Sequence, residues 1–195
     1  MALEQQKFDL IASAKTQLSN QNRGWSQRIR EGALRRLSNI GLPNHRDEYW
    51  KYTNPAELLT ENLSHSSVAG LEDPNVFSEI DTLKIVFCDG VFSSELSDDL
   101  TSENIEISRL ADVGDLHWAQ NYYGVLEEKG QNPVNRPLAA FNTAMASDGA
   151  LINIKGEVKR PILILGVHNN PAEAVLHHLI KVDKDCSVTL LESGP

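Results

Sequence analysis

ALINIKGEVKRPILILGVHNNPAEAVLHHLIKVDKDCSVTLLE, residues 150–192, is the stretch that decides the fold of this chain. Four aliphatic, β-prone runs begin at residues 150, 161, 174 and 186, at intervals of 11, 13 and 12 residues. Turn-forming residues separate the runs, namely Gly156, Asn169-Asn170-Pro171 and Asp183. Strands at such even spacing are typical of a sandwich, a barrel or successive half-turns of a β-solenoid, and periodicity alone does not choose among them.

A β-hairpin is predicted upstream of this stretch. LKIVFC (83–88) and VFSS (91–94) are β-prone, and Asp89-Gly90 between them is a two-residue turn that tolerates positive φ. IEISRL (105–110) predicts one further strand.

Two helices are expected between this strand and residue 150. Residues 115–129 carry apolar side chains at helical spacing, and Gly130 ends the pattern. Pro137 opens a shorter helix, because proline suits the first helical position, and Ser147-Asp148-Gly149 ends it.

The N-terminal part of the chain also predicts helices. Apolar side chains recur at helical spacing in two groups: Phe8, Ile11, Ala12 and Leu18, and then Trp25, Ile29, Ala33 and Leu37. Gly41 and Pro43 end the second helix. A short third helix is expected from Asn54, with Pro55 at its first position and Glu57 reaching back to the cap, followed by a polar connector over 60–80.

These elements predict an α+β chain in three parts. A helical N-terminal region and connector cover 1–80, a mixed β-hairpin and helical segment covers 81–149, and a β-rich core begins in 150–195. The chain stops just after a strand, which predicts an open sheet edge and a truncated fragment of a longer protein.

The charge balance disfavours nucleic acid as a partner. The 195 residues include 18 Lys and Arg against 27 Asp and Glu, for a net charge of −9, and an acidic protein is repelled by phosphates. Five arginines near the second helix are scattered around it by their spacing, which predicts a solvated face: Arg23, Arg28, Arg30, Arg35 and Arg36.

The N-terminal segment, the lack of long apolar stretches and the number of cysteines predict the compartment of the protein and the redox state of its thiols. The opening MALEQQKFDLIASAK has no continuous apolar segment, so no signal peptide is predicted, and no stretch approaches the roughly 18 apolar residues of a membrane span. Two cysteines, Cys88 and Cys186, indicate reduced thiols in a cytoplasmic protein rather than a disulfide framework.

Several catalytic motifs are missing from the sequence. It has no G-x-x-x-x-G-K-[ST] loop and no G-x-G-x-x-G loop, which argues against ATP hydrolysis and Rossmann-type dinucleotide binding. It also has no G-x-S-x-G elbow and no H-E-x-x-H zinc motif.

The histidines of the last strands raise the hypothesis of a metal site. His177 and His178 are adjacent, so they point to opposite faces of a strand, and only one of them could join His168 or Cys186 around an ion. The interpretation we favour is polar side chains on a solvated sheet face. Cys88, just before the Asp89-Gly90 turn, is predicted to be a small buried hydrophobe.

Three pairs of adjacent acids do not form a catalytic dyad by their spacing. A dyad needs two carboxyls that face each other across a cleft, and neighbours in sequence do not provide this. We therefore expect solvated surface at Asp47-Glu48, Asp98-Asp99 and Glu127-Glu128.

The segment DEYWKYT (47–53) concentrates aromatic residues in a chain that is only 6% aromatic. It lies between the helix ended by Gly41 and the helix expected from Asn54, so Trp50 is predicted to pack into that junction while Lys51 points to solvent. The run from Trp50 to Thr53 is interpreted as a structural anchor, with a partner surface as the alternative.

Three motifs, in this order, resemble the SufB/SufD iron–sulfur cluster assembly family, and SufD in particular. They are GLPNHRDEYWKYTNPAELL (41–59), IVFCDGVFSSELS (85–97) and PLAAFNTAMASDGALINIKGEVKRPILIL (137–165). The third motif is the most specific. SufB-type members carry a run of cysteines, whereas this chain has only Cys88 and Cys186, and the helical lead-in to Trp50 also looks like SufD.

The resemblance implies a fold and a set of partners. Family members have a helical N-terminal region, a right-handed parallel β-helix and a C-terminal helical domain. The β-helix pairs with SufB or with a second SufD, and the C-terminal domain docks the ATPase SufC. The strands after residue 150 would then be the first rungs of the β-helix. The chain would be a non-catalytic subunit supporting cluster assembly and iron acquisition.

No catalytic, cofactor-binding or metal-ligating residue is assigned from the resemblance. The cluster-related residues of the family lie mostly beyond the point where this chain stops, so the cluster is expected to be handled by the full complex. Two alternatives stay open: a β-solenoid that binds or processes carbohydrate, and direct metal binding through His168, His177 or His178, and Cys186.

Overall fold

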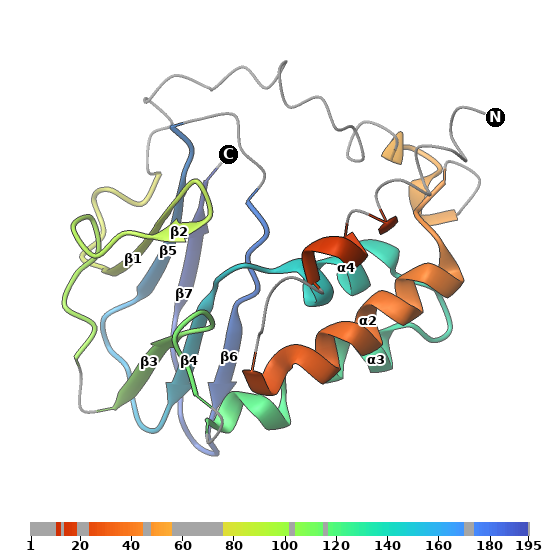
Figure 1. The fold of residues 1–195 in the computed structure, drawn as a ribbon. Helices are drawn as coiled ribbons and strands as arrows, with labels where there is room; N and C mark the ends of the chain where they lie inside the picture. Colours follow the sequence, from red (N-terminus) through yellow and green to blue (C-terminus); the bar gives the residue numbers. More distant parts are fainter. Residues whose placement is uncertain are drawn as a thin grey trace. The chain divides into compact units, whose positions relative to one another are not determined.

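The computed structural model describes residues 11–12, 14–18, 24–44, 48–55, 76–101, 104–114, 117–169 and 174–194. They belong to two compact units, each built from two segments: Met1–Glu61 with Gly114–Ala146, and Asn62–Val113 with Ser147–Pro195. The helices described below lie in the first unit and the strands in the second (Figure 1). The predicted α+β class is therefore confirmed. The predicted three-part division of the chain stays a prediction.

The central helix of the first unit is α2, Gln27–Ile40, which follows the 3-10 turn η1, Gly24–Ser26. Its buried stripe includes Ala33, Leu34 and Leu37, at the helical spacing that the sequence shows. Gly41 ends it at φ 77°, and the Gly41 N–H donates to the Leu37 carbonyl at 2.8 Å. The predicted end of this helix is confirmed.

The predicted continuous helix over 115–129 is wrong. The chain instead forms the 3-10 turn η5, Trp118–Asn121, and the short helix α3, Val125–Gly130. Gly124 separates them in a left-handed conformation with φ 74°. A Cβ on Gly124 would stand 2.7 Å from the Ile29 Cγ2 atom, so the close approach to α2 and the break both need glycine. The predicted end at Gly130 is correct.

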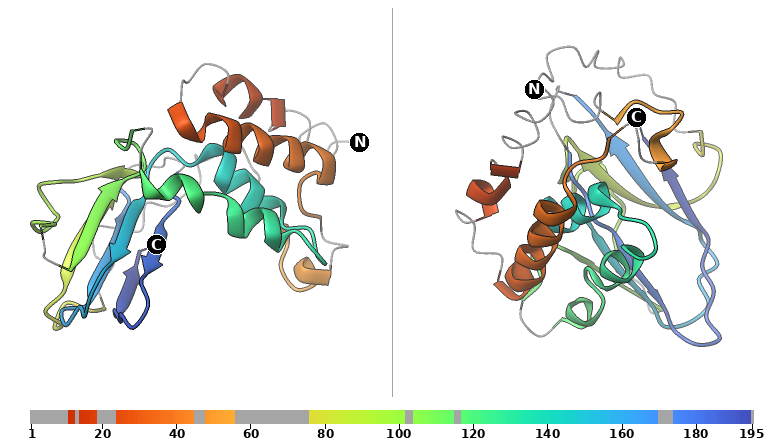
Figure 2. Two further views of the ribbon diagram at one scale, coloured as in Figure 1. Left: turned by 90° about the horizontal axis from the view of Figure 1, so that it is seen from below. Right: turned by 90° about the vertical axis from the view of Figure 1, so that its right-hand side faces the viewer.

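Helix α4, Pro137–Met145, begins at proline as predicted and packs along α2 (Figure 2). Ala33 on α2 and Ala140 and Ala144 on α4 are fully buried in one apolar cluster. Small side chains at these positions let the two helix axes approach closely.

Arg30 is buried in the first unit, so the predicted solvated face is wrong at this position. It shares the stripe of Ala33 and Leu37, and only 1% of it is exposed. Its guanidinium donates to the Ser26 hydroxyl at 2.9 Å, and to the carbonyls of Ala144 at 3.2 Å and Ala146 at 2.7 Å. Those carbonyls are at the C-terminal end of α4, where helical partners run out, so Arg30 caps the helix.

The other arginines of that prediction differ among themselves. Arg28 and Arg35 are exposed, as expected, and Arg36 is half-buried in an ion pair described below. Arg23 lies outside the described residues.

The second unit contains two sheets. One has the order β2-β1-β5-β7, from Val91–Phe92, Leu83–Cys88, Ile162–Val167 and Leu190–Ser193. The other has the order β3-β4-β6, from Ile105–Arg109, Ala150–Ile154 and Leu179–Val182. The predicted hairpin is confirmed, because β1 and β2 pair antiparallel and Asp89 and Gly90 have φ of 49° and 79°.

Consecutive strands after residue 150 alternate between the two sheets. β4 and β6 pair in parallel, with Leu151 beside Leu179, and β5 and β7 pair in parallel, with Ile162 beside Leu190. Both pairings join residues that are 28 apart, so the second tier, β6 with β7, repeats the first tier, β4 with β5. β6 and β7 begin later than residues 174 and 186, where the sequence predicts these strands to start. Among the described residues just before them, only isolated bridges form, at Leu176 and Ser187.

The core of the second unit lies between the two sheets (Figure 1). Ile152 and Ile154 of β4 meet Ile162 and Ile164 of β5 and Phe87 of β1 in one buried cluster. Since every second residue of a strand faces the same side, these residues define the inward face of each strand. The same register places Ile180, Val182, Leu190 and Glu192 on the inward face of the second tier.

Some predictions fall on residues that are not described. Ile11, Ala12 and Leu18 are helical as expected, whereas Phe8 lies outside the described residues. The helix expected from Asn54 and most of the connector fall in 56–75, also outside them. Among the described helices, none combines the length and the apolar character that a membrane span requires.

Candidate functional site

The most constrained point of the second unit is the corner at which the chain enters β4. A Cβ built on Gly149 would stand 2.0 Å from the His177 carbonyl oxygen and 2.6 Å from its carbon. No side chain fits at that separation from a backbone, so glycine alone lets the segment before β6 come this close. Gly149 therefore allows the backbone of the first tier to contact the backbone of the second tier at His177.

Asp148 beside it is a buried carboxylate with several donors. Only 3% of the residue is exposed. Its side chain accepts from Arg109 Nε at 3.1 Å and Nη2 at 2.6 Å, and from the N–H groups of Gly149 at 2.8 Å and Ala111 at 3.3 Å. A buried carboxylate is tolerated when it is paired and hydrogen-bonded, and here both conditions hold.

Arg109 extends this contact to two further elements. Its Nη1 lies 2.9 Å from Asp112 Oδ2, and its guanidinium carbon lies 5.1 Å from the centre of the Phe92 ring. The side chain therefore ties β3, β2 and the start of β4 together. We call the set Phe92, Arg109, Asp148 and Gly149 the Asp148 corner.

His178 lies next to this corner, between the sheets. Its Nδ1 accepts from the Ala150 N–H at 2.9 Å, and its ring centre lies 5.3 Å from that of Phe87. Burial lowers the pKa of His178, while the carboxylates of Glu192 and Asp148 act in the opposite direction. His178 thus faces the core rather than a solvated sheet face, so the favoured interpretation of the sequence is wrong for this residue.

The described histidines and the two cysteines do not form a cluster of metal ligands. Within the described parts of the chain, no three His, Cys, Asp or Glu side chains lie together as metal ligands would. His178 precedes β6 and Cys186 follows it, so the length of a strand separates them. Both cysteines are free, and Cys88 at the end of β1 is half-buried rather than buried as predicted.

The acid pairs match the expected solvated surface only in part. Asp99 is exposed and accepts from Thr101, whereas Asp98 is half-buried and accepts from the Lys84 N–H at 2.9 Å. Glu128 is exposed, but the side chain of Glu127 is only 4% exposed. Asp47 and the side chain of Glu48 lie outside the described residues.

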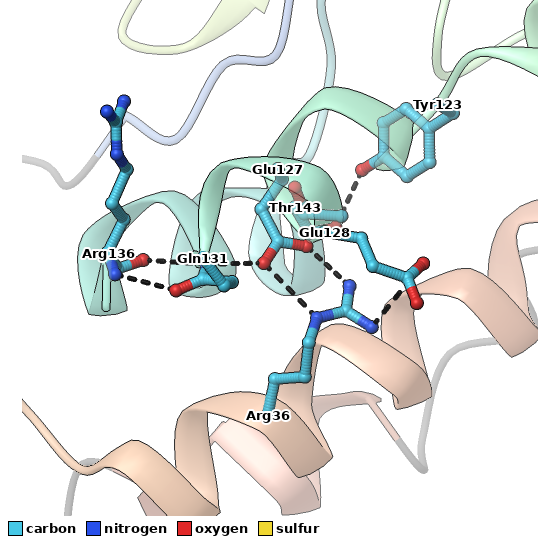
Figure 3. A network of polar contacts seen from close by, with 7 residues as sticks. All are labelled: Arg36, Tyr123, Glu127, Glu128, Gln131, Arg136 and Thr143. Carbon is cyan, nitrogen blue, oxygen red and sulfur yellow. Dashed lines mark hydrogen bonds and ion pairs between the residues drawn. The ribbon is translucent and has the colours of Figure 1, made fainter. Parts of the chain in front are cut away.

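Glu127 is the centre of a polar network in the first unit (Figure 3). It accepts from Arg36 of α2 at 3.2 and 2.5 Å and from the Gln131 amide at 2.7 Å. Gln131 also exchanges two hydrogen bonds with the backbone of Arg136, which holds the loop between α3 and α4. The hydrogen bond to Glu127 raises the pKa of Arg36, and burial opposes it.

Tyr123 continues the polar contacts of this unit toward α4. Its hydroxyl donates to the Thr143 carbonyl at 2.7 Å (Figure 3). Its ring packs edge-on against Trp25. Network and ring contacts together fix α2, α3 and α4 against one another.

The aromatic run at 49–52 is largely at the surface. Glu48–Trp50 forms the 3-10 turn η2, in which Tyr49 is 67% exposed and Trp50 is half-buried. Tyr52 is 90% exposed, and Lys51 Nζ lies 5.3 Å from the centre of its ring. A structural anchor at Trp50 and a partner surface at the tyrosines both stay predictions.

Sequence reasoning missed the residues that carry the Asp148 corner. The sequence predicts only that Asp148 and Gly149 end a helix and that Arg109 belongs to a strand. The available signal is an Asp-Gly pair directly before the mainly apolar strand ALINI, with an arginine near the end of the preceding predicted strand.

Comparison with known proteins adds a family. A family model described as the SufBD protein N-terminal region matches residues 1–164. A protein described as an iron–sulfur cluster assembly SufBD family protein, from Synechocystis sp., is 28% identical, over 84% of this chain and 38% of its own length. The chain therefore spans well under half the length of this relative.

Replacing Gly149 with alanine tests the close approach of the two tiers. Because the new Cβ would overlap the backbone of residue 177, Gly149→Ala should lower the free energy of unfolding by at least about 3 kcal/mol in chemical denaturation. Gly114→Ala is the matched control, because a Cβ there meets nothing within 4 Å, and it should change stability by less than about 1 kcal/mol. Equal effects of the two substitutions would contradict the close packing.

Adjacent glutamates test the polar network. Glu127→Ala should lower the free energy of unfolding by about 2–3 kcal/mol, since it leaves the half-buried Arg36 without its closest carboxylate. Glu128→Ala should cost less than about 0.5 kcal/mol, because its carboxylate is exposed and lies 3.9 Å from Arg36. Thermal and urea unfolding measure both, and a larger loss at Glu128 would rule out the assignment of Glu127 as the centre.

Proposed function

Because the chain belongs to the SufBD family, we propose that it is a non-catalytic, SufD-type subunit of a SufBCD iron–sulfur cluster assembly complex. The observation that carries the proposal is the family match over residues 1–164. The relative in Synechocystis is itself described as an iron–sulfur cluster assembly protein.

The chemistry of the described residues supports a structural role. Each buried carboxylate at the two polar centres, Asp148 and Glu127, is hydrogen-bonded to an arginine. Carboxylates held in this way position the elements around them, which is a structural task. The iron–sulfur cluster is cargo of the complete complex in this proposal, and this chain holds no cofactor of its own.

The SufD assignment rests on cysteine usage. The SufB side of the family uses a run of cysteines for nascent clusters, whereas this sequence has two, and both are free and half-buried. Thiolates are the ligands that iron–sulfur clusters take from proteins. A chain with so few thiols suits a partner that supports SufB and contributes to iron acquisition.

The two tiers are proposed to be the first rungs of a right-handed parallel β-helix. Two features support this: the constant 28-residue offset between parallel strands, and the alternation of strands between sheets. A third is the exposure of inward side chains on the second tier, where Ile180 is 37%, Val182 46% and Leu190 39% exposed. Apolar side chains on an inward face are expected to be covered, here by a further rung.

The proposed partners follow from this architecture. A SufB-like subunit would pair with the β-helix, with a homodimer as the alternative, and a SufC-like ATPase would supply the ATP hydrolysis for which this sequence has no motif. The assembly would be cytoplasmic. Neither the family match nor the relative supports the carbohydrate alternative.

Copurification tests the assignment. The complete gene product, tagged and coexpressed with SufB and SufC homologues from the same organism, should elute with both in a stoichiometric complex on size-exclusion chromatography. The tagged protein with Glu128→Ala is a surface control that should leave the complex intact. A protein that is folded by circular dichroism but elutes without either homologue would contradict the proposal.

A charge placed on the inward face tests the β-helix. In the complete gene product, Val182→Asp should cost more than about 3 kcal/mol of unfolding free energy, because a further rung would bury the carboxylate. Val91→Asp is the control, since Val91 is 60% exposed on the β1–β2 hairpin, and it should cost less than about 1 kcal/mol. Val182→Asp with as small an effect as the control would exclude a covering rung.

A further inference from the structure

One contact between the two tiers depends on the protonation state of a side chain. The His177 N–H donates to the Asp148 carbonyl at 3.0 Å, and regular pairing of β4 with β6 begins at Leu151 and Leu179. Between these points the Ala150 N–H donates to the side chain of His178, at 2.9 Å. An imidazole nitrogen therefore takes part in the line of hydrogen bonds that joins the tiers.

This hydrogen bond fixes the chemical form of the ring. Nδ1 can accept from an N–H group only when it carries no proton, so the ring is neutral and its proton is on Nε2. A second proton must add to Nδ1, which then faces the Ala150 N–H as donor against donor. The hydrogen bond is lost on protonation, and rotating the ring does not restore it, because both nitrogens then carry protons.

The surroundings of the ring act in two directions. Phe87 of β1 packs against it, and its half-buried position disfavours the charged form. Glu192 of β7 and Asp148 before β4 favour the charged form, although Arg109 already binds the Asp148 carboxylate. Glu192 lies on the inward face, beside Ile164, and is the larger of the two carboxylate influences on the ring.

We propose that His178 is a pH-operated latch between the tiers: the neutral ring holds β6 to β4 through Ala150, and the protonated ring releases it and turns toward Glu192. The release is local, because Asp148, Arg109 and Gly149 still hold the corner. Its effect is to loosen the start of β6, the strand at the edge of its sheet. The latch depends on these contacts alone and does not require the proposed function.

The direction of the pH effect follows from the shift. The pKa of His178 lies below the ordinary value of 6.5, so between these two values the unfolded chain binds more protons than the folded one. The stability that the neutral ring contributes is therefore complete above about pH 6.5 and declines as the pH falls toward the lowered pKa of the folded state.

Nuclear magnetic resonance of the complete gene product can measure the latch directly. At about pH 7.5, long-range proton–nitrogen spectra should show His178 protonated on Nε2 and not on Nδ1. The pH is lowered until the His178 ring is seen to take up its second proton. Across that step the hydrogen-exchange protection of the Ala150 amide, corrected for the intrinsic pH dependence of exchange, should fall about fivefold, as expected for losing one hydrogen bond. Unchanged protection, or a proton on Nδ1 at neutral pH, would overturn the proposal.

Two variants separate the latch from general acid destabilisation. Asn places an acceptor oxygen near the position of Nδ1 and does not titrate, so His178→Asn should keep the Ala150 protection constant over the same pH range. Glu192→Gln removes the carboxylate that favours the charged ring, so the fall in protection should shift to lower pH. If the Ala150 protection fell with pH in His178→Asn as much as in the natural chain, the proposal would be wrong, even where the overall stability of the variant is reduced.

Discussion

The Asp148 carboxylate is the interaction on which the second unit depends. A buried charge is costly unless its partners are fixed, and Asp148 is 3% exposed with Arg109 and two backbone N–H groups around it. Satisfying this carboxylate requires the end of β3 and the start of β4 to meet, and Phe92 of the hairpin packs against the same Arg109 guanidinium. Gly149, the next residue, then sets the distance to the second tier.

The first unit contains a buried group of the opposite charge, the guanidinium of Arg30, which is also hydrogen-bonded to fixed partners. Arg30 lies in the apolar stripe of α2, where its guanidinium satisfies carbonyls at the end of α4, and Glu127 of α3 accepts from Arg36 of α2. In both units a buried ionic group joins separate elements by directional hydrogen bonds, whereas the Ala and Leu contacts around it are weakly directional. We infer that apolar packing supplies most of the stability and that these groups favour one arrangement of the elements.

Local signals in the sequence predicted the elements well where a single residue decides the geometry. Gly41 ended α2, Asp89-Gly90 formed the hairpin turn, and Pro137 began α4, because each preference is a property of the residue itself. Gly124 was missed since an isolated glycine is compatible with a helix, and only the approach of Ile29 requires the left-handed break. The burial of Arg30, Glu127 and Asp148 depends on partners far along the chain, which periodicity does not contain.

Two polar residues, His178 and Glu192, occupy positions of the second tier that correspond to apolar positions of the first tier. Positions 28 apart occupy equivalent places, so Glu192 repeats the place of the buried Ile164, and His178 stands one residue before the Leu151–Leu179 pairing. Apolar side chains at these inward positions would pack better against the first tier. Instead, a histidine that accepts a backbone hydrogen bond and a carboxylate on the neighbouring strand make the attachment of the second tier respond to protons. The Asp148 corner next to it is held by hydrogen bonds from Arg109, which do not involve the imidazole.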